Sequence, residues 1–266
     1  MSAIGIFDSG MGGLTVMRAL MARLPRERFL YLGDTARLPY GTKSGDTVTR
    51  YAVQAAAALT QRGVKLVVVA CNTASAVALP ALEAALAPVP VIGVIAPGAQ
   101  AALATAPEGP IAIIATEGTV KGGAYRRAIR ALAPDVPVVQ QACPLFVPLA
   151  EEGIVTGEIA EAVARRYLEP LMATLPRPRC LVLGCTHFPV LRDTIAKVVG
   201  PDVALVDSAQ TTALVVEQAL ANLPRDTSGA CSFLVTDAPD RFARVGEIFL
   251  GRPIDPGSVE LVDIQN

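Results

Sequence analysis

The strongest constraint on the fold is an alternation, along nearly the whole chain, between short β-branched runs and longer segments rich in Ala, Leu and Arg. Runs that are apolar at every position are typical of strands buried on both faces, with the interleaved helices as cover. We therefore expect an α/β fold with mostly parallel sheets. The expected strands are residues 4–7, 29–32, 66–70, 91–94, 111–115, 136–139, 181–183, 205–206 and 233–235, and the expected helices are residues 14–24, 47–62, 74–86, 98–106, 122–132, 158–174, 190–199, 211–223 and 241–249.

The ends of the expected strands repeat along the chain. Three of them have later counterparts at offsets of 108, 114 and 111 residues: Asp8 and Thr116, Cys71 and Cys185, and Ala96 and Asp207. This repetition predicts two similar three-layer α/β domains, one made of residues 1–96 and 207–266 and the other of residues 97–206. A chance agreement is the alternative, because any regular strand-helix alternation yields some similar offsets.

Ligands of open α/β sheets bind beyond the carboxyl ends of the strands. Two such domains facing each other would enclose an active-site cleft at those ends. The side chains that the topology places there are Asp8, Cys71, Thr116, Cys185 and His187, and His187 is the only histidine in the chain.

Composition excludes several classes of protein. The net charge is −1 with no basic run, so nothing indicates nucleic-acid binding. The apolar runs are too short to cross a bilayer, and the first residues lack the charged region of a signal peptide. Five widely spaced cysteines fit free thiols in a reducing compartment. We expect a cytoplasmic protein with no membrane partner, and the high apolar content leaves room for a homodimer interface.

Cys71 and Cys185 differ from the other cysteines because each begins a polar tripeptide that leads into a helix. A helix N-terminus stabilises a thiolate, so we expect a lowered thiol pKa there. Inert core cysteines are the alternative, and we accept that reading for Cys143, Cys180 and Cys231. A metal site of Cys71, Cys185, His187 and Asp8 is a further alternative, but no close-spaced ligand pair supports it.

Other motifs point to fewer functions. The glycines of residues 8–13 lack the spacing of a dinucleotide fingerprint, and residues 41–44 lack that of a P-loop. A tight strand-to-helix turn that aims N–H groups at a carboxylate explains the first of these segments. None of the four lysines lies in a setting suited to a pyridoxal Schiff base. His187 can hold a proton at neutral pH or be structural, and Asp8 can cap a helix, act in catalysis, or both.

At these residues the sequence resembles the bacterial glutamate racemases, within the cofactor-independent aspartate/glutamate racemase family. The matching segments run in order over nearly the whole chain: residues 7–10, 12–16, 33–41, 70–75, 115–120, 143–149, 184–189 and 207–209. The resemblance implies interconversion of L- and D-glutamate by a two-base thiol mechanism without a cofactor or metal. It also implies a supply of D-glutamate for peptidoglycan.

The resemblance further implies a role for individual residues. Cys71 and Cys185 match the two acid/base thiols, with Asp8 assisting Cys71 and His187 assisting Cys185. Asp34 and Glu151 match positions where the family carries acidic residues. The substrate contacts that it implies are Asp8, Ser9, Tyr40, Gly41, Asn72, Thr73, Thr116, Thr119, Thr186 and His187.

Three rival functions follow from the same residues. The nearest is a two-thiol racemase that acts on aspartate or a hydantoin, since the sequence gives the side-chain pocket only as scattered Ser, Thr and Asn residues. A non-catalytic amino-acid-binding protein with the same cleft would bind glutamate without exchanging its α-proton. A metal-dependent hydrolase is the third.

Overall fold

The computed structural model describes residues 3–223 and 228–264 and contains two sheets of parallel strands. The six-stranded sheet has the order β10 (Val259–Leu261), β9 (Cys231–Val235), β2 (Phe29–Gly33), β1 (Ile4–Asp8), β3 (Leu66–Val69) and β4 (Val91–Gly93). The four-stranded sheet has the order β6 (Val138–Ala142), β5 (Ile111–Ala115), β7 (Cys180–Gly184) and β8 (Ala204–Asp207).

The two sheets repeat one topology. Neighbouring strands β2-β1-β3-β4 of the first sheet have the same connectivity as β6-β5-β7-β8 of the second, so each strand has a counterpart in chain order. The predicted fold class, two similar α/β units with parallel sheets, is confirmed. Strands β9 and β10 extend only the first sheet, next to β2.

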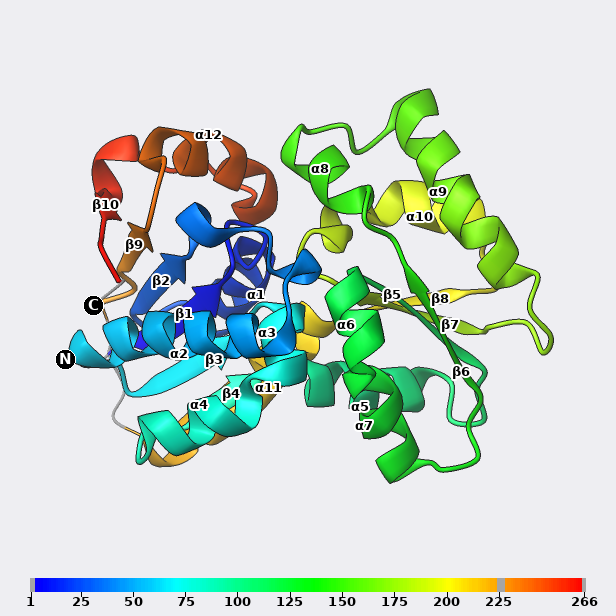
Figure 1. Cartoon of the computed structure of the whole chain (residues 1–266), viewed down its shortest axis with the longest axis horizontal. Coiled ribbons are helices and arrows are strands. Elements are labelled where there is room, and N and C mark those ends of the chain that lie inside the picture. The colour runs from blue at the N-terminus through cyan, green and yellow to red at the C-terminus, as the bar shows by residue number, and fades with distance from the viewer. Residues whose placement is uncertain (1–2, 224–227, 265–266) are drawn as a thin grey trace.

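Helices cover both faces of both sheets (Figure 1). The first lobe is the six-stranded sheet with α1 (Leu14–Arg23), α2 (Gly45–Gln61), α3 (Asn72–Val77), α4 (Leu79–Leu86), α11 (Ser208–Ala219) and α12 (Pro239–Leu250). The second lobe is the four-stranded sheet with α5 (Ile95–Thr105), α6 (Glu117–Gly122), α7 (Ala124–Leu132), α8 (Phe146–Glu151), α9 (Gly157–Met172) and α10 (Arg192–Val199).

One hydrophobic core runs from lobe to lobe. It joins side chains of α1, α11 and α12 to side chains of α8, α9 and α10 through buried residues on one face of each sheet. Separate cores fill the opposite faces, under α2 and α4 in the first lobe and under α5 and α7 in the second. The domain boundaries after residues 96 and 206 stay a prediction, because α5 and α11, which begin at these points, pack against each other.

Several predicted elements differ from the structure. The helix expected over residues 74–86 is two helices that meet at Ala78, and the one over residues 122–132 is preceded by the separate α6. Gly123, at φ +63°, makes that second break in a conformation that favours glycine. Sequence reasoning also missed β10 and α8, and it placed β6 two residues early.

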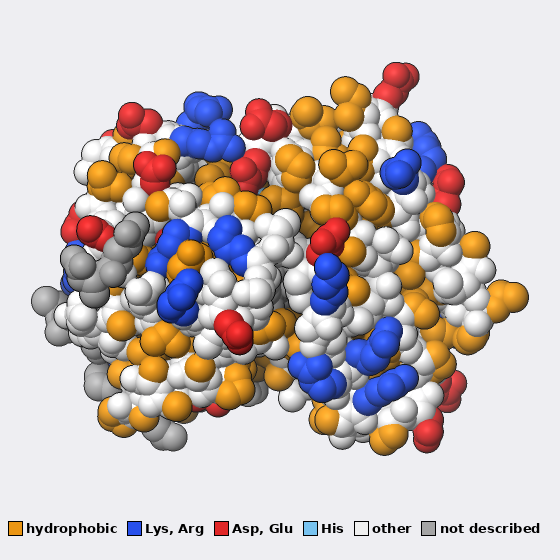
Figure 2. Space-filling view, in the orientation of Figure 1, with side chains coloured by type: hydrophobic (Ala, Val, Ile, Leu, Met, Phe, Trp, Pro, Cys, Tyr) orange, Lys and Arg blue, Asp and Glu red, His pale blue; other side chains and the backbone are white. Residues whose placement is uncertain are grey.

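The surface shows a seam between the two lobes, which their shared core joins beneath it (Figure 2). Hydrophobic side chains gather over α8 and α9, where Leu145, Ile154 and Ile159 are exposed. Within the described ranges, no helix has the length and apolar character needed to span a bilayer.

Candidate active site

The polar side chains predicted for the cleft lie at the carboxyl ends of central strands in both lobes. Asp8 ends β1, and Cys71 follows β3 as the N-cap residue of α3. Thr116 follows β5 as the N-cap residue of α6, and Cys185 directly follows β7. Each lobe therefore presents one thiol at an equivalent strand end.

The thiol of the first lobe is enclosed. Cys71 is 5 % exposed, its Sγ accepts the Ala74 N–H at 3.4 Å, and it lies 3.6 Å from Ser9 Oγ. Burial first, and then the charge of Asp8, raises the pKa of the Cys71 thiol to about 12. The predicted lowering at a helix N-terminus is wrong for Cys71, because desolvation outweighs the N–H donors of a six-residue helix. The charge of Cys185 also raises this pKa, so the two sulfurs interact electrostatically.

The thiol of the second lobe has a histidine beside it. His187 Nδ1 lies 3.9 Å from Cys185 Sγ and 3.4 Å from Thr186 Oγ1, and its Nε2 lies 3.1 Å from Glu151 Oε1. Burial lowers the pKa of His187, but hydrogen bonds to Cys185 and Glu151 outweigh it and raise the pKa to about 10. The imidazole is therefore protonated at neutral pH and can donate from both nitrogens.

Asp8 is fully buried and incompletely hydrogen-bonded. Its Oδ2 accepts the Gly10 N–H at 3.0 Å, whereas its buried Oδ1 has no hydrogen-bond partner among the described residues. Burial raises the pKa of Asp8, although the charge of His187 and backbone N–H groups, led by that of Gly13, lower it. An orphaned carboxylate oxygen in a site is suited to a positively charged ligand group.

Asn72 presents the complementary case. Its Oδ1 accepts the Tyr125 hydroxyl at 2.8 Å, and its buried Nδ2 has no hydrogen-bond partner in the described part of the chain. The tyrosine hydroxyl thus fixes the orientation of the amide, with Oδ1 toward Tyr125 and Nδ2 on the other side. An amide N–H₂ left without an acceptor is suited to a carboxylate.

Three threonine hydroxyls form a cluster between the lobes. Thr73 Oγ1 lies 3.0 Å from Thr116 Oγ1 and 3.2 Å from Thr119 Oγ1, and the latter two are 3.1 Å apart. Gly41 admits this cluster, because a Cβ there would lie 2.7 Å from Thr116 Cβ. These predicted site residues are brought together as a polar lining shared by α3 and α6.

The glycine loop after β1 packs against the second lobe. A Cβ on Gly12 would lie 2.4 Å from His187 Nδ1 and 2.5 Å from Thr186 Oγ1. Thr15 Oγ1 donates to the backbone oxygen of Thr186 at 3.0 Å. The loop therefore makes room for the histidine and does not show the spacing of a phosphate loop.

Tyr40 and Asp34 form a buried anchor within the first lobe. The Tyr40 hydroxyl donates to Asp34, which also accepts from Arg37 Nε at 2.7 Å and from Thr236 Oγ1 at 3.0 Å. Burial, followed by the charge of Asp34, raises the pKa of Tyr40. The hydroxyl of Tyr40 is therefore engaged by Asp34. Asp34 in turn links several loops of its own lobe.

The remaining cysteines are free thiols, of which Cys143 lies near enough to Cys185 to interact with its charge. Cys143 and Cys180 are buried, and Cys231 lies near Met21 and Arg252. Burial raises the pKa of all three thiols. Across residues 3–223 and 228–264, no three His, Cys, Asp or Glu side chains are grouped to hold a metal ion, so the metal alternative has no ligand set there.

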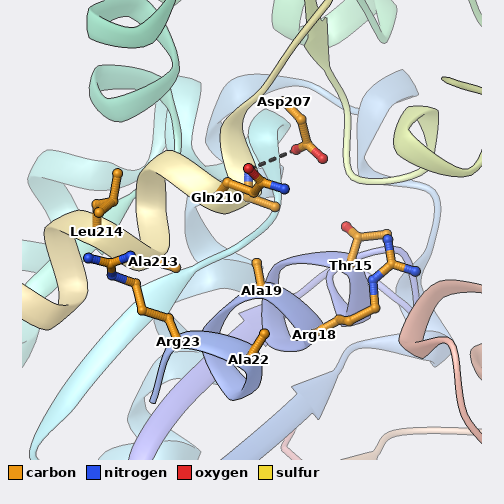
Figure 3. A pocket seen from close by; sticks show the side chains of 10 residues that line it. Thr15, Arg18, Ala19, Ala22, Arg23, Asp207, Gln210, Ala213 and Leu214 are labelled. Atoms are coloured by element: carbon orange, nitrogen blue, oxygen red, sulfur yellow. Dashed lines mark hydrogen bonds between the residues drawn. The ribbon is translucent and has the colours of Figure 1, made fainter. Parts of the chain in front are cut away.

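Two cavities adjoin the site. One of about 350 Å³ lies where α2 and α6 approach each other, shares Thr73 with the threonine cluster, and carries Lys43 and Lys121. The other, of about 410 Å³, lies between α1 and α11, with Thr15 on one wall and Gln210 on the other (Figure 3). The first connects the polar lining to solvent beside two cations.

The arrangement has counterparts in known proteins. A family model described as Asp/Glu/Hydantoin racemase matches residues 10–216 of the chain. The chain belongs to the Asp/Glu/hydantoin racemase family. The predicted family, and with it the enzyme class of a racemase, is confirmed.

Relatives within this racemase family match nearly the whole chain. The glutamate racemase of Geobacter metallireducens is 52 % identical over 253 residues, which cover 94 % of this chain and 93 % of the relative. The crystal structure of the Francisella tularensis glutamate racemase in complex with D-glutamate has a TM-score of 0.91 at 37 % identity and covers 99 % of this chain and 98 % of that one. The Thermus thermophilus enzyme in complex with β-chloro-D-alanine has a TM-score of 0.86 at 44 % identity, covering 98 % and 97 %.

Sequence reasoning missed several residues of the site. Thr15 on α1 donates to Thr186, and Tyr125 on α7 donates to Asn72. Nothing in the sequence pattern of these two helices marks either residue as part of the site. Arg241 donates to Glu151, the other acidic residue that the resemblance picked out, at 3.1 Å. The signal that pointed to Glu151 was the family resemblance, and no sequence signal pointed to Arg241.

Proposed function

We propose that the chain interconverts L- and D-glutamate with two thiols as the acid and the base. The observation that carries this proposal is the pair Cys71 and Cys185, one at an equivalent strand end of each lobe and electrostatically coupled. Their surroundings differ, because Cys71 has Ser9 and Asp8 nearby while Cys185 has His187. The relatives named above are glutamate racemases, which supports glutamate as the substrate.

Racemisation removes the α-proton from one face of the carbon and returns a proton to the other. A clamped substrate therefore needs a base on one side and an acid on the other. At neutral pH Cys71 is a thiol, since its pKa is raised to about 12. An imidazolium beside Cys185 stabilises negative charge on that sulfur. We infer that one sulfur acts as the base while the other acts as the acid, and that the two exchange roles after each turnover.

The orphaned polar atoms support a bound amino acid. Asp8 Oδ1 is a buried acceptor and suits the α-ammonium group, while Asn72 Nδ2 is a buried donor and suits a carboxylate. Negative charge that develops as the proton leaves spreads into the α-carboxylate. Donors from Asn72, Thr186 and Ser9 would stabilise that charge, as in other sites with preorganised donors.

Burial of the site supports the same chemistry. Cys71, Asn72, Thr73 and Cys185 are all at most 6 % exposed, so the described arrangement is a closed one. A site from which water is excluded strengthens every electrostatic contact within it. Substrate entry then requires the lobes to separate along the seam between them.

The threonine cluster is our choice for the side-chain carboxylate of glutamate. One of its members, Thr73, lines the cavity that carries Lys43 and Lys121, which favours an anionic group on that side. Aspartate, one methylene shorter, remains the alternative substrate. Equal turnover of aspartate and glutamate would refute the assignment to glutamate.

Incubation in D₂O tests the central proposal. The metal-depleted chain, with no cofactor added, is given L-glutamate and D-glutamate separately. We expect the opposite enantiomer to appear with deuterium at the α-carbon from either starting material. Binding without deuterium incorporation would instead indicate a non-catalytic amino-acid-binding protein.

The cellular role is part of the proposal. D-glutamate formed in this way would be supplied to peptidoglycan synthesis in the cytoplasm, where cysteines stay reduced. Loss of the gene product should therefore create a requirement for external D-glutamate. A homodimer, which the exposed apolar surface over α8 and α9 leaves room for, also stays a prediction that light scattering tests.

A further inference from the structure

Arg241 of helix α12, in the first lobe, is linked to the Cys185 thiol of the second lobe. The link consists of two intervening side chains, Glu151 and His187. Arg241, near the start of α12, donates to Glu151 Oε2 at 3.1 Å. The other oxygen of this carboxylate, Oε1, lies 3.1 Å from His187 Nε2, and His187 Nδ1 lies 3.9 Å from Cys185 Sγ. A continuous chain of polar contacts thus runs from Arg241 to the sulfur.

We propose that Arg241 is a positioning residue for the reaction, which holds the Glu151 carboxylate against His187 and so keeps His187 beside Cys185. This inference rests on the proposed function for its catalytic meaning. Its structural content, the dependence of His187 on Arg241, stands apart from whether glutamate is the substrate.

Glu151 needs an external anchor because its side chain projects from the end of a short helix and is not fixed by that helix alone. It is the last residue of the six-residue helix α8, and Gly153 follows in a left-handed conformation at φ +71°. A glutamate side chain has several rotamers, and one hydrogen bond to His187 leaves the carboxylate free to rotate. A charged partner on the second oxygen fixes the plane of the carboxylate and its distance from the imidazole.

A second contact from the same helix supports the role of α12. The rings of Phe249 and His187 meet edge to face with their centroids 5.0 Å apart. Phe249 is fully buried at the far end of α12, so the helix contacts the imidazole directly through an aromatic ring and indirectly through Arg241 and Glu151. The position of His187 therefore depends on α12 at both ends.

The charges around His187 make the proposal testable, because the direction in which the His187 pKa changes on removal of Arg241 distinguishes two roles for that arginine. Asp8 at the end of β1, Cys185 after β7 and Glu151 on α8 all raise the pKa of His187. Arg241 on α12 touches Glu151, and Glu152 lies 3.8 Å from Arg241. If Arg241 only neutralised Glu151, its removal would raise the pKa of His187. If Arg241 positions Glu151, its removal lets the carboxylate leave and the pKa falls.

The experiment uses His187 as its own reporter, because it is the only histidine in the chain. The full-length chain, purified without a histidine tag, is titrated by NMR of the imidazole ring protons. Variants are Arg241→Gln, Arg241→Lys, and the matched control Arg244→Gln, which alters an exposed arginine on the same helix. Steady-state kinetics with glutamate accompany each titration.

We expect Arg241→Gln to lower the pKa of His187 by about one unit and kcat by about tenfold, with KM nearly unchanged. Arg241→Lys should restore most of both values, because it keeps a donor and a charge, and Arg244→Gln should change neither. In a Glu151→Gln background, Arg241→Gln should have no further effect, since coupled residues are non-additive.

Three results would overturn the proposal. They are an unchanged or raised His187 pKa in Arg241→Gln, an equal loss of kcat in Arg244→Gln, and an effect of Arg241→Gln that persists undiminished in the Glu151→Gln background. If the chain does not racemise glutamate but its His187 titration shifts as expected, the proposed function fails while the positioning role stands.

Discussion

Gly12 of the first lobe and His187 of the second lobe occupy the same small space: a Cβ on the glycine would lie 2.4 Å from the imidazole Nδ1. The imidazole is held from its other side by Glu151, so it has no room to retreat. The lobes therefore meet beside the Cys185 thiol only because residue 12 is a glycine, which has no Cβ.

Replacement of Gly12 by alanine should displace His187 or Thr186 and lower kcat by at least about a hundredfold, the cost of a misplacement near the reacting atoms. Steady-state kinetics measure the loss, with Gly257→Ala as the control, because a Cβ there meets nothing closer than 3.4 Å. Near-normal kcat in Gly12→Ala would show that the lobes do not close in this way during turnover.

Removal of either thiol should strongly slow racemisation from both enantiomers. General acid–base groups contribute about a hundred- to ten-thousandfold, so we expect losses in that range for Cys71→Ala and Cys185→Ala. Each variant keeps one base and should exchange the α-proton of only one enantiomer in D₂O, the opposite one for each variant. Cys231→Ala, at a thiol beside Met21 and Arg252, is the control, and two-way activity in either single variant would exclude the assigned roles.

The raised pKa of His187 makes stability fall as pH rises. The folded pKa is about 10 against an ordinary 6.5, so protonation favours the folded state. The contribution is full below pH 6.5 and is lost as pH rises through about 10. Urea unfolding of the wild type and of His187→Asn should therefore differ most near pH 6 and converge near pH 10. A difference that grows with pH would contradict the protonated imidazole.

Loss of the Tyr125 hydroxyl should weaken substrate binding more than chemistry. Tyr125→Phe removes the donor to Asn72 Oδ1 and lets the amide turn away from its ligand. We expect KM for glutamate to rise about fivefold, near the net value of one hydrogen bond, with a smaller change in kcat. Tyr51→Phe, which keeps its ring contact with Tyr40, serves as the control. An unchanged KM would show that Asn72 is oriented without the tyrosine.

Much of the fold follows from local pattern, and its exceptions have physical causes. Buried strands such as β1 and β7 are apolar at every position, so their sequences alone indicate them. The edge strand β10 has only three residues and is largely exposed, which leaves no hydrophobic pattern to read. Pro148 looks like a break in the sequence but lies in the first turn of α8, where its missing N–H costs nothing.

The candidate site was predictable where strand ends carry its residues, as for Cys71 and Cys185. The pKa of the Cys71 thiol was not, because its direction depends on burial between two lobes and not on the adjacent helix alone. The contact between Glu151 and Arg241 spans ninety residues and joins a helix that the pattern missed to one that it found. Such contacts are set by how the lobes meet.

The threonine cluster has a consequence for how a ligand is received. In each of its three pairs either oxygen serves as the donor, so the hydroxyl hydrogens can turn without any heavy atom moving. An incoming carboxylate would meet three O–H groups already gathered in one place, and its capture would then require only the rotation of hydrogens.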